Sequence, residues 1–105
     1  MRKYAKFWRY VRRLRADFPL AHPVSIRTYK TVKDENGHRL FGDCELVNGK
    51  FLIRIERGED ESVMIDTLWH EISHALVGVE HGHKRCFWDQ YSKIYRHFLE
   101  DHQIS

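Results

Sequence analysis

Cysteine and proline are both scarce in this chain of 105 residues, which contains two of each. Cys44 and Cys86 lie far apart and form no Cys-x-x-Cys pair, so the sequence indicates neither a zinc ribbon nor a disulfide framework. Two isolated thiols suit a reducing compartment. Pro19 and Pro23 are close together and are expected to end one helix and lead into an extended segment.

Long hydrophobic runs are also missing. No stretch approaches the roughly 18 uninterrupted apolar residues of a membrane-spanning helix, and the charged N-terminus leaves no room for a signal-like apolar segment. We therefore expect a cytoplasmic protein with no membrane partner. A hydrophobic content of 42% with 13% aromatic residues is typical of a globular chain, and the length predicts one domain over residues 1–105, expected to be a monomer.

What the sequence does contain is the motif His-Glu-x-x-His, formed by His70, Glu71 and His74. Histidines four residues apart on a helix lie on the same face one turn apart, so both can reach one metal ion, and the intervening Glu can act on a water molecule there. The chain has eight histidines, so the pattern alone is only suggestive. Its context decides between a zinc site and a pair of surface histidines.

The helix that carries the motif is predicted to have two faces. Its apolar arc consists of Met64, Ile65, Leu68, Trp69, Ile72, Ala75, Leu76 and Val79. Its opposite arc consists of Asp66, Thr67, His70, Ser73 and His74. A helix that packs on one side and directs two histidines to the other favours a zinc site with one Zn²⁺ per chain.

The remaining pattern predicts an α+β fold with the order helix, three strands, helix, helix. The acidic segment 58–62 is expected to open the motif helix and Gly78 to close it. Asn48-Gly49 predicts a hairpin turn, because both central positions of a type I′ turn need positive φ. The other elements are expected at residues 3–17, 24–32, 39–47, 50–56 and 84–101.

A catalytic zinc takes three protein ligands and leaves a fourth position to water, so a third donor must follow His74. Glu80, His81 and His83 are the candidates. His81 is preferred, because Gly78 lets the chain leave the helix and a short turn before Gly82 can bring His81 back over the motif. The other two candidates remain open.

For catalysis, Glu71 is predicted to be the general base. Tyr91 or Tyr95 on the last helix is a candidate donor to the oxyanion, although aromatic residues at this spacing are more often part of a core. Asp66 and Asp89 are candidates to orient a ligand imidazole, with a solvated carboxylate as the alternative. The strand at residues 50–56 is expected to form the edge of the cleft and to bind an extended peptide by β-augmentation.

These residues resemble the SprT-like (Spartan-type) zinc metallopeptidases, and especially short metallopeptidase-like proteins of bacteriophages. The resemblance covers roughly residues 40–99 and depends on the run from Leu68 to Leu76, on His81-Gly82, Phe87-Trp88, Tyr91 and Tyr95, and on Gly42-Asp43-Cys44 before the hairpin. It implies a minimal zincin-like domain in the host cytoplasm that hydrolyses peptide bonds, with zinc on His70, His74 and His81 and with Glu71 catalytic. The cysteine-rich ribbon of larger members is missing.

Residues 1–15 carry seven Lys or Arg and no acid, with Trp8 and Tyr10 among them. Such a face can bind nucleic acid, and Spartan-type relatives act on proteins bound to DNA, so DNA is a candidate partner; a merely solvated face is the alternative. The competing function for the whole chain is a zinc-stabilised module that binds nucleic acid or protein without significant hydrolysis. Glu71 favours the peptidase, because a structural zinc site needs no carboxylate beside a water position.

Overall fold

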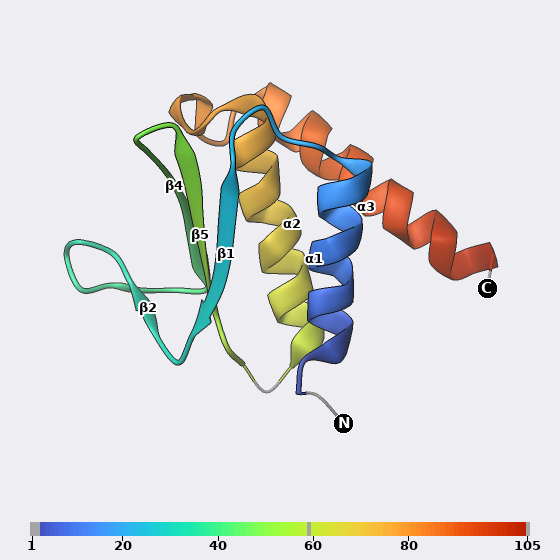
Figure 1. The fold of residues 1–105 in the computed structure, drawn as a ribbon, viewed down its shortest axis with the longest axis horizontal. Coiled ribbons are helices and arrows are strands. Elements are labelled where there is room, and N and C mark those ends of the chain that lie inside the picture. Colours follow the sequence, from blue (N-terminus) through green and yellow to red (C-terminus); the bar gives the residue numbers. More distant parts are fainter. Residues whose placement is uncertain (1–2, 59, 105) are drawn as a thin grey trace.

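The computed structural model describes residues 3–58 and 60–104, apart from the side chains of His81 and of residues 100–104. Arg2 and Glu59, which belong to the basic and acidic segments discussed above, therefore lie outside the described residues. Helix α1 (Ala5–Asp17) is followed by the strands, and α2 (Glu61–Val77), the short 3₁₀ helix η1 (Val79–His81) and α3 (Arg85–Ile104) complete the chain. The predicted α+β class and the order of its elements are confirmed (Figure 1).

The main sheet has three strands in the order β1-β5-β4, formed by β1 (Val24–Tyr29), β5 (Lys50–Glu56) and β4 (Gly42–Val47). β4 and β5 form the predicted antiparallel hairpin, and its two turn residues, Asn48 and Gly49, have φ of 51° and 76°. These angles are those that a type I′ turn requires. β1 runs parallel to β5, with Ile26 opposite Ile53.

The strand order corrects one expectation. β5 lies between β1 and β4, so the predicted role of residues 50–56 as the edge of a cleft is wrong. Both sides of β5 already pair with neighbouring strands, so its backbone has no free side for a peptide. The two edges of the described sheet are β1 and β4, and β4 is the edge that contacts both α2 and η1.

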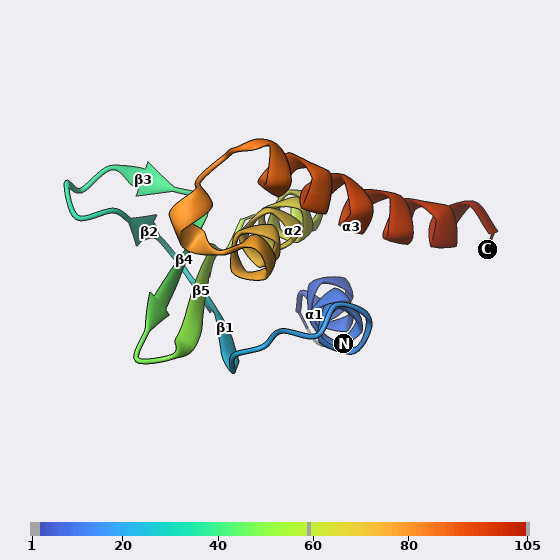
Figure 2. The same cartoon turned by 90° about the horizontal axis from the view of Figure 1, so that it is seen from above.

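A small second hairpin interrupts the two outer strands that the sequence predicted as continuous. β1 ends at Tyr29, and the chain then forms β2 (Val32–Lys33), which pairs with β3 (Arg39–Leu40). The Asp34 carboxylate accepts hydrogen bonds from two backbone N–H groups within the turn, which fixes its shape. Figure 2 shows this hairpin projecting from the sheet, on the side away from the helices.

Helix α2 occupies the centre of the fold. It packs on β4 and β5, and α1 and α3 both pack against it (Figures 1 and 2). The hydrophobic core contains residues from the sheet, from α2 and from the two helices that pack against α2. It includes Phe7, Val11, Leu14, Ile26, Ile53, Ile55, Met64, Leu68, Ile72, Ile94 and Phe98.

This central position corrects the predicted two-faced pattern of the motif helix. Ser73, expected on the polar arc, is fully buried, and its Oγ donates to the Trp69 carbonyl oxygen at 2.7 Å. A helix covered by a sheet on one side and by two helices on others buries more of its circumference than one apolar stripe indicates. The hydroxyl is tolerated there because it is hydrogen-bonded.

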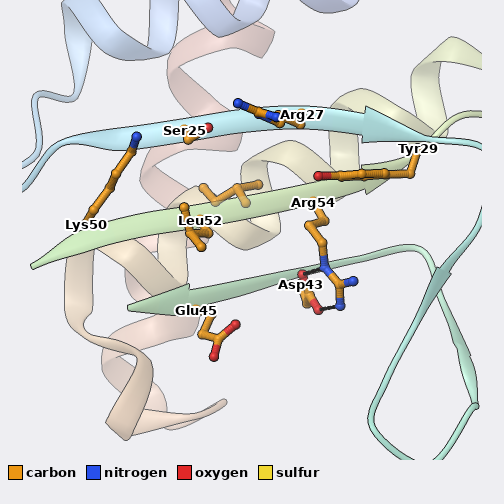
Figure 3. A pocket seen from close by; sticks show the side chains of 9 residues that line it. Ser25, Arg27, Tyr29, Asp43, Glu45, Lys50, Leu52 and Arg54 are labelled. Atoms are coloured by element: carbon orange, nitrogen blue, oxygen red, sulfur yellow. Dashed lines mark hydrogen bonds and ion pairs between the residues drawn. The ribbon is translucent and has the colours of Figure 1, made fainter. Parts of the chain in front are cut away.

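The face of the sheet that points away from α2 carries polar side chains (Figure 3). Arg54 is held there by the Asp43 carboxylate, and its Nη2 also donates to the Lys33 carbonyl oxygen at 3.1 Å. A shallow hollow of about 420 Å³ lies on this face, bordered by Arg27 and Lys50 among others. None of the motif residues of α2 lines it.

Candidate metal centre

Helix α2 presents the motif with defined ends. Asp60 is its N-cap, and the Asp60 side chain accepts the Ser62 N–H at 3.0 Å. Gly78 ends the helix, with its N–H donating to the His74 carbonyl oxygen and with a φ of 101° that favours glycine. Between these ends, the rings of His70 and His74 lie one turn apart with centroids separated by 5.0 Å.

A third histidine completes the cluster. The Nε2 atom of His83 lies 3.0 Å from Nε2 of His70 and 3.2 Å from Nε2 of His74. Each of the three residues offers one ligand atom, and these atoms all lie within 4.8 Å of one another. His70 and His74 are half-buried, whereas His83 is exposed.

The other two candidates for the third position lie nearby in the chain. The backbone of His81, the preferred one, lies in η1, but its side chain lies outside the described residues. The Glu80 carboxylate lies against Gly78, where a Cβ on that glycine would approach a Glu80 oxygen to 2.6 Å. The cluster among the described residues does not include Glu80. Of the candidates whose side chains are described, His83 is therefore the one that lies beside the two motif histidines.

The connection between α2 and α3 explains how His83 reaches the motif. Gly78 and Gly82, with φ of 101° and 56°, flank η1 at its two ends. Both values lie in the region that L side chains rarely adopt, so the two glycines let the chain turn sharply on either side of this short helix. Figure 2 shows the connection looping over the end of α2 before α3 begins.

An aromatic wall holds the three imidazoles in place. Phe87, at the start of α3, is fully buried and stacks on His74 with centroids 4.4 Å apart. Its ring also lies 4.8 Å from that of His70 and 4.9 Å from that of His83. On the outer side, Trp88 stacks on His83 with centroids 5.8 Å apart. Packing on two sides restricts how the rings can rotate.

The surroundings keep the motif histidines neutral. Burial, together with the neighbouring His70 and His83, lowers the pKa of His74 to about 4. Burial and His83 also lower the pKa of His70, although the Asp66 carboxylate opposes this shift. Neutral imidazoles offer the free nitrogen lone pairs that a metal needs.

Glu71 points to another environment, beneath strand β4. It is buried, and burial and the nearby Asp43 carboxylate raise its pKa to about 8. Cys44 on β4 lies in the same region, since burial and the negative charges of Glu71 and Asp43 raise its pKa to about 12.

The two predicted tyrosines differ in position. Tyr91 is half-buried, and its ring centroid lies 6.5 Å from that of His70. Its hydroxyl donates to the Asp66 carboxylate. Burial and this hydrogen bond raise the pKa of Tyr91. Tyr95 is exposed, one turn further from the cluster, and packs on Tyr91 and Trp69.

Of the two carboxylates expected to orient a ligand, Asp66 thus bonds to Tyr91. Asp89 is exposed and lies 3.9 Å from the Arg85 guanidinium. Among the described residues, neither carboxylate forms a hydrogen bond with a histidine of the cluster. The charge of Asp66 nevertheless acts on His70, because it opposes the lowering of the pKa of that imidazole by burial and by His83.

The fold and the site together define a small α+β domain with a three-histidine cluster that could bind a metal ion. Comparison with protein-family models, with curated proteins and with solved structures finds no match to this chain. Among the described residues, none of the helices has the length and apolar character needed to cross a membrane.

Proposed function

We propose that this protein is a zinc-dependent metallopeptidase, in which His70, His74 and His83 hold the metal and Glu71 is the general base. The observation that carries the proposal is the convergence of three Nε2 atoms, separated by 3.0 Å and 3.2 Å along the two contacts of His83. Nitrogen atoms on one tetrahedral zinc, each at about 2.0–2.1 Å from it, lie roughly 3.3–3.4 Å apart. The cluster is therefore close to the required size.

The chemistry of the donors supports a metal more strongly than a hydrogen-bond network. The Nε2 atom of His83 faces two other ring nitrogens, and it can donate to only one of them. Ring nitrogens that point at one another in this way are the donor set that a metal ion needs. Three protein ligands also match a catalytic zinc site, which keeps its fourth position for water, rather than a closed structural site.

Glu71 supplies what a structural site would not need. When bound at such a cluster, zinc polarises a carbonyl group and lowers the pKa of water toward neutrality. A carboxylate oxygen of Glu71 would accept the proton from the attacking water and return it to the leaving amine.

Strand β4 is the element that would hold the substrate. It is an edge of the sheet, it contacts η1 and α2, and its residues Asp43 and Cys44 lie near Glu71. An extended polypeptide that adds to its free edge would be bound through backbone hydrogen bonds, which are largely independent of sequence. These features, with the resemblance of the motif region to SprT-like metallopeptidases, support a polypeptide as substrate.

The test is Glu71→Gln, which removes the base but no proposed ligand. We expect the variant to keep its zinc and its fold while peptide hydrolysis falls by a factor on the order of a hundred or more. Zinc content is measured by elemental analysis and hydrolysis with an unstructured protein substrate. Equal turnover by the variant and the wild type would overturn the role of Glu71, whereas absence of hydrolysis by the zinc-bound wild type would favour a zinc-stabilised binding module.

A second proposed activity is DNA binding, and it is favoured by a specific feature of the surface. Lys3, Lys30 and Arg57, from three separate segments, border one hollow of about 500 Å³. Cations gathered from the segment before α1 and from the segments that follow β1 and β5 would suit a phosphate backbone. Arg13 does not border this hollow, and its guanidinium lies 4.9 Å from the centre of the Phe98 ring.

A further inference from the structure

Helix α3 carries two apolar stripes, and only one is used by the core. Phe87, Ile94 and Phe98 are fully buried. A neighbouring stripe at positions i, i+4, i+7 and i+11 consists of Trp88, Ser92, Tyr95 and Leu99. Its three large side chains are 50%, 43% and 40% exposed. A row of exposed large apolar side chains is typical of a binding surface.

This outer stripe is continuous with the histidine cluster. Trp88 stacks on His83 with an interplanar angle of 30°. Tyr91 lies between the cluster and the outer end of the stripe: its ring is 6.5 Å from that of His70 and stacks on Tyr95 at 6.3 Å. A ligand lying along the stripe would therefore have one end beside the proposed metal.

A hollow interrupts the stripe where its side chain is small. Ser92 occupies the position between Trp88 and Tyr95, and a hollow of about 190 Å³ is bordered by Tyr91, Ser92, Tyr95 and Arg96. Pockets for drug-sized ligands are larger, roughly 300–1,000 Å³, so this hollow suits a single side chain. Its aromatic borders can pack against a ring, and the Arg96 guanidinium can lie over the face of one.

We infer that the surface formed by Trp88, Tyr91, Ser92 and Tyr95, the aromatic ridge, binds a large apolar or aromatic side chain of the polypeptide substrate. This inference rests on the proposed peptidase function and names a preference that binding at β4 alone would not give. Single-stranded nucleic acid also stacks on aromatic residues, but its binding depends on a positively charged groove. Among the residues that border the hollow Arg96 is a single cation, and the nearby Arg85 pairs with Asp89, which is less than the charged groove that a nucleic-acid strand needs.

The experiment measures binding separately from hydrolysis. Glycine- and serine-rich peptides with one central Phe, Leu, Ala or Glu are titrated into the protein of 105 residues, with and without zinc, and amide shifts of residues 88–96 are followed by NMR. We expect the Phe and Leu peptides to bind at least about tenfold more tightly than the Ala and Glu peptides. Ser92→Leu, which fills the hollow, should reduce this preference to less than about threefold.

The matched control is Lys93→Leu, which introduces the same side chain at the next, exposed position of α3. It should retain the full preference. Three results would each overturn the inference. The first is an equal side-chain preference in Ser92→Leu and wild type, and the second is a dimer that buries the ridge. The third is single-stranded DNA that shifts the amides of residues 88–96 and binds more tightly than the Phe peptide. Peptide binding without hydrolysis supports the ridge and overturns only the peptidase proposal, whereas hydrolysis without side-chain preference overturns only the ridge.

Discussion

The Nε2 atoms of His70 and His83 lie 3.0 Å apart although thirteen residues separate the two in the chain. His70 belongs to α2, whereas His83 lies in the connection to α3. The cluster therefore depends on tertiary structure: the turn at Gly82 and the packing of Phe87 decide where the His83 ring points. This relationship gives the most direct test of the proposed metal centre.

We predict that His83→Ala lowers zinc affinity about as much as His74→Ala, since each would remove one of three ligands. The loss should exceed the roughly 10- to 100-fold that is typical when only a residue supporting a ligand is changed. Zinc competition with a chelator measures the affinities, and elemental analysis should find one zinc per chain in the wild type.

His81→Ala is the matched control for His83→Ala, because it removes the histidine that the sequence pattern favours as the third ligand. It should keep most of the zinc affinity if His83 is the ligand. Severe loss in His81→Ala with a nearly unchanged His83→Ala variant would instead assign the third position to His81.

We predict that Gly42→Ala destabilises the protein by roughly 1–3 kcal/mol, the usual cost of forcing extra volume into a packed site. An added Cβ would come within 2.7 Å of both the Arg54 carbonyl oxygen and Thr67 Cγ2. The backbone of β5 cannot yield easily, so β4 would have to move away from α2. Denaturant unfolding measures the change, and near-wild-type stability would show that β4 adjusts without cost.

Gly58→Ala is the control for that variant. The nearest atom to a Cβ added there is the Asp60 nitrogen at 4.0 Å, so a methyl group has room. We expect its stability to lie within about 0.5 kcal/mol of the wild type.

We predict that the stability of the metal-free protein, relative to Glu71→Gln, falls as the pH rises from about 5 to 8. The folded-state pKa of Glu71 is raised from 4.5 to about 8, so over this range the native state binds more protons than the unfolded state. Its contribution is fully present below 4.5 and is lost as the pH passes 8. The difference should be on the order of a few kcal/mol, measured by denaturant unfolding with chelator present.

The comparison with Glu71→Gln matters because the motif histidines titrate in the opposite sense. Their lowered pKa values make the protein less stable as the pH falls below about 6.5, in both proteins alike. A difference that stays constant with pH would contradict the buried environment of Glu71.

We predict that changing Lys3, Lys30 and Arg57 together to Ala weakens DNA binding to a similar extent for all sequences. Its salt slope should decrease by about two to three, roughly one for each phosphate that the variant no longer neutralises. Fluorescence anisotropy at several salt concentrations measures both quantities. Lys33, Lys50 and Lys93 changed together to Ala form the control, with the same loss of charge at exposed positions outside the hollow. Absence of wild-type binding at low salt would contradict the proposal.

Local features of the fold were predictable from sequence because they depend on neighbouring residues. Asn48-Gly49 forms the expected hairpin turn and Gly78 ends the motif helix as expected. The strand order was not predictable in this way. β5 follows β4 directly, but its second partner is the distant β1, and no local signal in the sequence specifies this parallel pairing.

The site divides in the same way. His70, Glu71 and His74 were recognisable from their spacing, which a helix converts directly into geometry. The choice between His81 and His83 depends on backbone angles at two glycines, which leave few constraints in the sequence. The influence of Asp43 on Glu71 and the bond from Tyr91 to Asp66 join separate elements, so neither could be read from periodicity.

The exposed position of His83 also bears on how fast a metal would be exchanged. His70 and His74 belong to a helix packed between a sheet and two other helices, whereas His83 is exposed and lies just after Gly82 in the connection to α3. Regions with few buried contacts open with the smallest free energy. Release would thus begin at His83, and the dissociation rate would follow the opening of this connection rather than the global unfolding of the domain.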